Sequence, residues 1–224
     1  RPIFIMSPSR FTLVGSPSPS SVVMTNNLYA YTFTGGEITG AGTFSKYGTD
    51  GLTLATPNTF TGATTFAAGI VDIPAGAGIN VGNTANMSVF NVAAVAGNTV
   101  LNINGGTVNA SKTTAPALQV GTTSGANGVI NLTSGYLSAG SELWLGAGGS
   151  GQNAFGALIV TGGSVTSANY IALGRATTAT GNNRGELLMS GGTVVCTVNN
   201  IEIGSYQNYA TNTSVATLTG GTLT

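Results

Sequence analysis

The sequence predicts an all-β fold, a right-handed parallel β-helix (β-solenoid) whose coils repeat with a period of about 28–29 in the C-terminal half of the chain. Three observations lead to this prediction: an eight-residue segment recurs at a fixed spacing, apolar and polar residues alternate inside it, and a second apolar strand follows most copies. A fixed period of this size is typical of stacked repeats, in which each unit buries its apolar side only against its neighbours. Apolar residues nowhere recur at helical spacing, which excludes a solenoid of helices.

The recurring segment has five copies, at 101–108, 130–137, 158–165, 187–194 and 216–223. Apolar residues in it alternate mostly with Asn, Thr or Ser, which is typical of a strand with one buried face. A pair of small residues then breaks the alternation and predicts a tight corner with a positive φ angle. The second member of each pair is a glycine, and the position numbers of successive glycines differ by 29, 28, 29 and 29: Gly106, Gly135, Gly163, Gly192 and Gly221.

A second strand follows each of the first four copies, at 118–121, 143–146, 171–174 and 201–204. In each strand two apolar residues flank a middle residue, so we expect the outer two to point inward and the middle one outward. A polar loop of variable length then leads to the next copy. Further strands of the same stack are expected at 79–81 and 87–92.

Residues 1–21 are less regular than the rest of the chain and contain two candidate strands, which a Pro-Ser segment separates from residue 22. We expect residues 1–21 to cap the first coil or to pair with a neighbouring molecule, because the open end of a β-helix needs a cover. Residues 22–224 are expected to form one β-solenoid domain, as a piece of a longer polypeptide. The apolar residues of the candidate assembly strands are Ile3, Phe4, Ile5, Phe11, Leu13 and Val14.

The segment 38–71 carries a spaced glycine pattern that continues into Asn-Thr-Phe-Thr-Gly at 58–62 and Ala-Gly-Ile-Val at 68–71. This segment resembles the autotransporter-associated β-strand repeat, with Phe44 in place of Leu and an extra residue at Asp50. The resemblance implies a secreted or surface-displayed bacterial β-helix that serves as a scaffold, without implying a chemistry. The matching positions are Ile38, Gly40, Gly42, Phe44, Lys46, Gly48, Gly51, Leu52 and Leu54.

Composition narrows the classes of function further. Charged residues make up 5% of the chain and the net charge is zero, so no basic surface is available to attract nucleic acid or an anionic membrane. No apolar run is long enough for a transmembrane helix. The single cysteine, Cys196, falls in a column of small residues with Ala110, Ala139 and Ser167, which predicts a buried thiol.

The inventory of reactive side chains argues against catalysis. The chain has no histidine, the commonest general base and metal ligand, and no cysteine cluster or phosphate-binding loop. Glu142 and Glu202 are the best acidic candidates, but two coil steps separate them by about 10 Å, which is too wide for a retaining glycosidase pair and marginal for an inverting one. We therefore expect solvated charges, no enzyme, and no catalytic, cofactor-binding or metal-binding residues.

The candidate binding residues are Trp144, Tyr170, Glu142, Arg175 and Arg184. The only tryptophan is expected to face outward, where it could stack on a sugar ring or a partner protein, or be covered by a loop. The two arginines bracket the loop 176–183, which could contact an acidic glycan or could be solvated. Ile159 and Leu188, outward by register, suggest that one face is covered.

Two functions are compatible with these observations. The first is a structural protein, a β-solenoid subunit of an extracellular bacterial fibre that assembles head to tail. The second is a surface adhesin or autotransporter passenger stalk that contacts polysaccharide or a cell surface. Both place the protein outside the bacterial cell, with no cofactor, no nucleic acid and no transmembrane segment.

Overall fold

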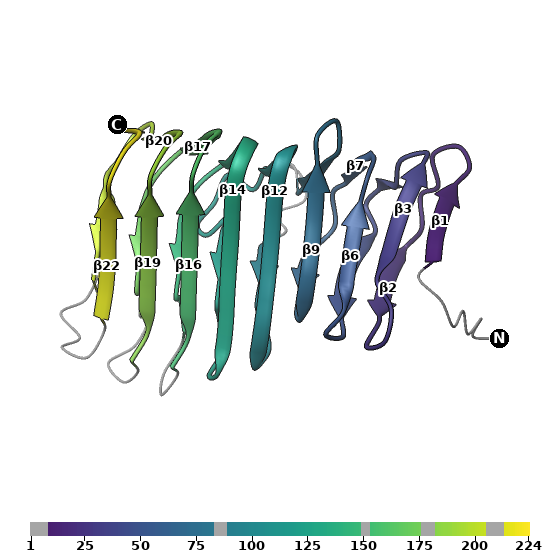
Figure 1. Ribbon diagram of the computed structural model, residues 1–224, viewed down its shortest axis with the longest axis horizontal. Coiled ribbons are helices and arrows are strands. Elements are labelled where there is room, and N and C mark those ends of the chain that lie inside the picture. Colours follow the sequence, from purple (N-terminus) through teal and green to yellow (C-terminus); the bar gives the residue numbers. More distant parts are fainter. Residues whose placement is uncertain (1–8, 83–88, 149–152, 176–181, 205–212) are drawn as a thin grey trace.

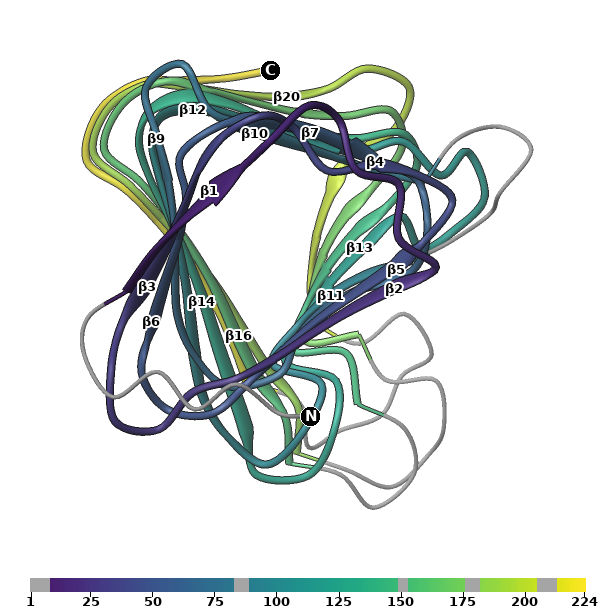
Figure 2. The same ribbon diagram turned by 90° about the vertical axis from the view of Figure 1, so that its right-hand side faces the viewer.

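The computed structural model describes residues 9–82, 89–148, 153–175, 182–204 and 213–224, and these residues form 23 strands and no helix. The strands pair in parallel and lie on three faces of one elongated coil (Figure 1). Viewed from the N-terminal end, the chain runs clockwise as it recedes, so the coil is right-handed (Figure 2). The predicted right-handed parallel β-solenoid is therefore confirmed.

Each face is a ladder of strands from successive coils. The first face contains β1 (Ser9–Leu13), β3 (Tyr31–Gly35), β6 (Gly51–Leu54), β9 (Gly69–Pro74), β12 (Gly97–Ala110), β14 (Ala126–Ala139), β16 (Phe155–Val160), β19 (Arg184–Met189) and β22 (Thr213–Leu218). The second face contains β4 (Thr39–Gly40), β7 (Pro57–Phe60), β10 (Gly78–Val81), the C-terminal parts of β12 and β14, β17 (Ser164–Ser167), β20 (Thr193–Cys196) and β23 (Thr222–Leu223). The third face contains β2 (Ser21–Thr25), β5 (Thr43–Tyr47), β8 (Thr64–Phe66), β11 (Phe90–Val92), β13 (Leu118–Val120), β15 (Leu143–Leu145), β18 (Ile171–Leu173) and β21 (Ile201–Ile203).

The coils have two lengths. In the C-terminal half, Leu101 pairs with Ile130, and paired positions along this column differ by 28 or 29 in the sequence, as predicted. In the N-terminal half, Ser9 pairs with Tyr31, Tyr31 with Leu52 and Leu52 with Val71, so the paired positions differ by only 22, 21 and 19. The difference in coil length arises mainly where the chain passes from the third face to the first. In a short coil, residues 67–68 join β8 to β9, whereas in a long coil residues 146–154 join β15 to β16.

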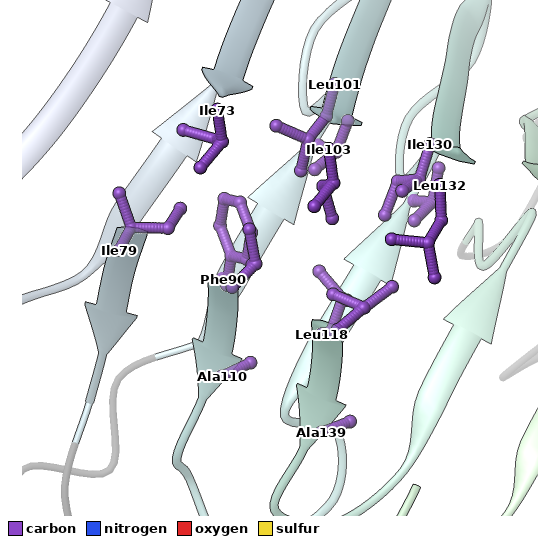
Figure 3. Packing of buried hydrophobic residues seen from close by; sticks show 14 of the residues in the cluster. Ile73, Ile79, Phe90, Leu101, Ile103, Ala110, Leu118, Ile130, Leu132 and Ala139 are labelled. Atoms are coloured by element: carbon purple, nitrogen blue, oxygen red, sulfur yellow. The ribbon is translucent and has the colours of Figure 1, made fainter. Parts of the chain in front are cut away.

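The core consists of columns of inward side chains that pair in register from coil to coil. Leu101, Ile130, Leu158 and Leu187 form one such column on the first face and are all fully buried. Phe90 and Leu118, which pair on the third face, point toward the side of the core that holds Leu101 and Ile130 (Figure 3). Residues at the same position of every coil thus bury their apolar surface against each other, which is the main source of stability in a stacked repeat.

Aromatic rings fill the core of the shorter coils. Phe44 stacks on Phe60, with ring centroids 5.1 Å apart and an interplanar angle of 14°. Phe66 meets Phe44 and Phe90 edge to face, at 6.2 and 5.1 Å. Such offset and edge-to-face pairs are the favoured geometries of aromatic side chains, and they add to the stability that burial supplies.

The predicted glycine corners are found between the first and second faces. Gly135, Gly163, Gly192 and Gly221 all have positive φ angles, between 72° and 91°. In the first copy the positive φ of 88° belongs to Gly105 instead of Gly106, because the ladder between β12 and β14 is irregular at this corner. The predicted corner is therefore present in this copy too, with the first glycine of the pair as its left-handed residue.

The cysteine column is also as predicted, since Ala110 pairs with Ala139, Ala139 with Ser167, and Ser167 with Cys196. Cys196 is half-buried, although full burial was expected. Burial still raises the pKa of its thiol, because the thiolate loses solvation, while a backbone hydrogen bond from Ile171 opposes the shift. The thiol is therefore disfavoured as a nucleophile.

Candidate functional site

The middle residues of the third-face strands form an outward column, in which Gln119, Trp144, Ala172 and Glu202 pair in register. Trp144 faces outward, as the sequence predicts, but it is only partly exposed. Ala172 is fully buried despite its outward position, so neighbouring side chains cover this part of the face. The surface around Trp144 is thus a packed group of side chains, called the Trp144 cluster below, which consists of Glu142, Trp144, Arg175 and Glu202.

Glu142 is the residue whose environment differs most from expectation. It was predicted to be a solvated surface charge, but only 6% of it is exposed. Its Oε2 accepts a hydrogen bond of 2.6 Å from the indole Nε1 of Trp144 and lies 3.2 Å from Nη1 of Arg175. The alternation correctly places Glu142 outward, and its burial arises because Trp144 and Arg175 fold over it.

Arg175 connects this cluster across neighbouring coils. Its guanidinium carbon lies 4.5 Å from the centroid of the Trp144 ring, within the range of a cation–π contact. Its Nη1 lies 3.2 Å from Oε2 of Glu142 and 3.7 Å from Oε2 of Glu202, so one cation is shared by two carboxylates. The ring is therefore covered by an arginine, and both glutamates are engaged in ion pairs.

Tyr170 precedes β18 and lies next to Glu142 in the ladder. Its carbonyl oxygen accepts hydrogen bonds from the backbone N–H of Leu143, at 3.0 Å, and from the hydroxyl of Ser167, at 3.0 Å. Tyr170 is half-buried, and its backbone bonds to Leu143, the residue before Trp144.

Arg184 lies apart from this group, because it begins β19 on the first face. It forms an ion pair with Glu186 of the same strand, and its guanidinium carbon lies 5.6 Å from the ring centroid of Phe155. The structure therefore does not bring Arg175 and Arg184 to one site. Residues 176–181 of the loop between them lie outside the described residues.

The candidate assembly residues are only partly described, since Ile3, Phe4 and Ile5 fall outside the described range. Phe11 and Leu13 point into the first coil, where Phe11 lies 5.5 Å from Phe33 and 5.4 Å from Tyr31 between ring centroids. Val14, just after β1, is 90% exposed. β1 pairs with β3 as the first strand of the ladder, so residues 9–13 belong to the same stack as the rest of the chain.

A groove on the outer side of the first face was not predicted from the sequence. Its first hollow, of about 390 Å³, crosses β9, β12, β14 and β16 and is lined by polar residues such as Asp72, Asn102 and Asn131. A second hollow of about 290 Å³ continues across β16, β19 and β22 and shares Ile159 with the first. In the axial view, the corner after these strands projects outward beyond them (Figure 2). The groove therefore runs along the coil axis.

Hydrogen bonds between neighbouring coils organise the polar half of the groove. Asn102 Nδ2 donates to Asp72 Oδ1 at 2.8 Å, and Asn131 Nδ2 donates to Asn102 Oδ1 at 2.8 Å. Ile159 and Leu188 continue the same outward column into the apolar half. A sequence signal could have revealed this ladder: an Asn lies between two apolar residues, and the same pattern recurs one coil later.

A buried cation, Lys46, is the second feature that the sequence interpretation missed. Lys46 is fully buried, and its Nζ donates hydrogen bonds to the carbonyl oxygens of Tyr47, Gly48 and Ala68 at 2.8–3.1 Å. Burial lowers the pKa of Lys46 to about 8, while the nearby carboxylate of Asp50 acts in the opposite direction. Its sequence position, two residues after Phe44, already implied an inward side chain.

These features define the class of the protein as a parallel β-solenoid repeat protein. No protein-family model, no curated protein sequence and no solved structure matches the chain. Among the described residues, none belongs to a helix that could span a membrane, and no group of three or more Cys, Asp or Glu side chains is placed to hold a metal ion.

Proposed function

We propose that this chain is a non-enzymatic structural protein, a β-solenoid subunit of a bacterial surface fibre that assembles end to end. The observation that supports the proposal is the parallel stacking of coils, whose inward columns continue in register to the last described coil. Ile203, Leu218 and Leu223 are 57%, 46% and 42% exposed, whereas their partners one coil earlier are buried. A further coil stacked on β21, β22 and β23 would cover them.

The occupant we propose for this edge is the first coil of a second copy. There, Phe11 of β1 and Val22 and Met24 of β2 point inward and are only half-buried. Head-to-tail stacking keeps all strands parallel and continues the apolar columns, so that Met24 would follow Ile203 and Phe11 would follow Leu218. A head-to-tail interface that does not close generates an open filament.

The proposed location, secreted and on the surface of a bacterium, follows from composition and resemblance. The low charge and the abundance of Thr, Ser, Asn and Gly fit a secreted solenoid, and residues 38–71 resemble the autotransporter-associated repeat. We propose membership of that repeat class on these residues.

Electron microscopy of the purified chain over a concentration series tests the proposal. We expect fibres. Their diffraction should show an axial spacing of about 4.8 Å, which is the spacing between strands, with the strands perpendicular to the fibre axis. Separate short rods at every concentration would contradict end-to-end assembly.

The second candidate is an adhesive stalk, and the groove along the first face is the observation that favours it. The groove spans six coils and offers both polar and apolar side chains to an extended ligand. Rods that remain separate but bind a polymer would favour this function over the fibre.

A further inference from the structure

We infer that the groove on the first face binds an uncharged, linear polysaccharide lying along the solenoid axis. This inference rests on the second candidate function, the adhesive stalk, and does not depend on end-to-end assembly. It assigns the ligand contact to the first face, away from the Trp144 cluster on the third face.

The polar half of the groove presents donors and acceptors together. Each Asn side chain has two N–H donors and a carbonyl with two lone pairs, and the ladder from Asp72 to Asn131 uses one N–H of each amide. The remaining groups line the first hollow, together with Thr133 and Thr161. Sugar hydroxyls both donate and accept hydrogen bonds, so this mixed lining suits them.

The apolar half complements the other side of a sugar ring. Ile159 and Leu188 line the groove as partly exposed aliphatic side chains on adjacent coils. The C–H faces of a pyranose pack against such apolar surface while its hydroxyls turn to polar neighbours. Because the coils repeat at about 4.8 Å, equivalent side chains recur at nearly the length of one sugar residue.

The lining also distinguishes an uncharged polymer from the alternatives. Among the described residues that line the two hollows, Asp72 carries the only charge, so an anionic polymer would meet a carboxylate and no cation. An extended peptide that added to the sheet would need free backbone groups, but the strands under the groove are paired on both sides from β9 to β19. A neutral glycan requires neither a cation in the groove nor free backbone groups on the strands.

Affinity electrophoresis of the full chain tests the inference, in gels that contain laminarin, hydroxyethyl cellulose or galactomannan, with polygalacturonate as the acidic comparison. We expect at least one neutral polymer to retard the protein. Ile159→Asp should weaken that binding at least tenfold, because Ile159 lines both hollows and the substitution replaces its apolar side chain with a second charge in the groove.

The matched control is Asn109→Ala, which removes an outward ladder amide from the second face, where Asn109 accepts a hydrogen bond of 2.7 Å from Ser138. Circular dichroism verifies that each variant keeps the fold, and the gels are run at concentrations below those that give fibres. Retardation by no neutral polymer rejects the inference, as does retardation that Ile159→Asp leaves unchanged or that Asn109→Ala weakens equally. If the protein binds a neutral polymer but never forms fibres, the inferred polysaccharide binding holds and only the proposed fibre is rejected.

Discussion

Arg175 lies over the ring of Trp144, with its guanidinium carbon 4.5 Å from the ring centroid. The two residues come from neighbouring coils, and the same guanidinium reaches Glu142 and Glu202, so three successive coils share one cation. In a solenoid, each coil is held mainly by its two neighbours, so a side chain that contacts both acts on the coupling between coils. Arg175 therefore links β15, β18 and β21 through its side-chain contacts.

Replacing Arg175 with alanine should destabilise this part of the stack by about 1–3 kcal/mol, because the nearly buried Glu142 loses its cation and Trp144 its cover. The measurement is denaturant unfolding followed by the fluorescence of Trp144, the only tryptophan, which reports these coils directly. Arg184→Ala is the control, since the side chain of Arg184 is 55% exposed in its own ion pair and should contribute below about 1 kcal/mol. Equal losses of stability from the two substitutions would contradict a role of Arg175 in linking neighbouring coils.

Lys46 should make stability depend on alkaline pH. In the unfolded chain its amine holds a proton up to about its ordinary value of 10.5, whereas in the folded chain the pKa is lowered to about 8. Between these values the unfolded state binds more protons, so stability should rise as pH increases from about 8, by at most about 3 kcal/mol over the whole window. Urea unfolding between pH 7.5 and 9.5 measures this slope.

The control for this pH effect is Lys46→Met, which keeps an unbranched side chain of similar length and removes the titrating amine. The rise in stability between pH 8 and 9.5 should become clearly smaller in this variant. Lys112, whose pKa is also lowered by burial, contributes in the same direction and accounts for a residual slope. Cys196, whose thiol pKa is raised by burial, acts in the opposite direction, so the comparison with Lys46→Met is decisive. A pH dependence that is the same in the wild type and in Lys46→Met would contradict the lowered pKa of Lys46.

Alternation was enough to predict which side chains point inward, because a strand of period two leaves no other choice once one face is buried. It assigned β13, β15, β18 and β21 and the inward column of Leu101 correctly. It could not predict exposure where a residue from another coil folds over the surface, as Arg175 does over Glu142. The groove was missed for a related reason: it depends on how far the corner projects, which the residue pattern does not specify.

The glycine corners offer a test that separates backbone strain from steric clash. A Cβ on Gly163 would lie 2.7 Å from the carbonyl oxygen of Gly135, one coil earlier, and its φ of 74° is unfavourable for other residues. Gly163→Ala should therefore cost the conformational strain of about 1–2 kcal/mol and a further packing penalty. Thermal unfolding by circular dichroism measures the loss.

The matched control is Gly125→Ala. Gly125 has nearly the same φ, 73°, but a Cβ there would meet nothing closer than 3.5 Å, the Cβ of Ala96. This variant should show the strain alone, with a smaller loss than Gly163→Ala. If both substitutions cost the same, the corners require glycine only for its φ angle and not for close approach of successive coils.

Assembly should depend on the inward side chains of the last coil. Leu218→Lys places a charge where we propose that the next copy packs, and the exposure of Leu218 lets the new ammonium group reach water without unfolding β22. Buried against Phe11 of a second copy, the same charge would lose its hydration, so fibres should be absent or should need at least tenfold more protein. Val215→Lys is the control, because Val215 is an outward residue of the same strand and is 47% exposed. Fibres that form equally with both substitutions would place the joint elsewhere, whereas loss of fibres with Leu218→Lys and not with Val215→Lys would locate it on the inner side of the last coil.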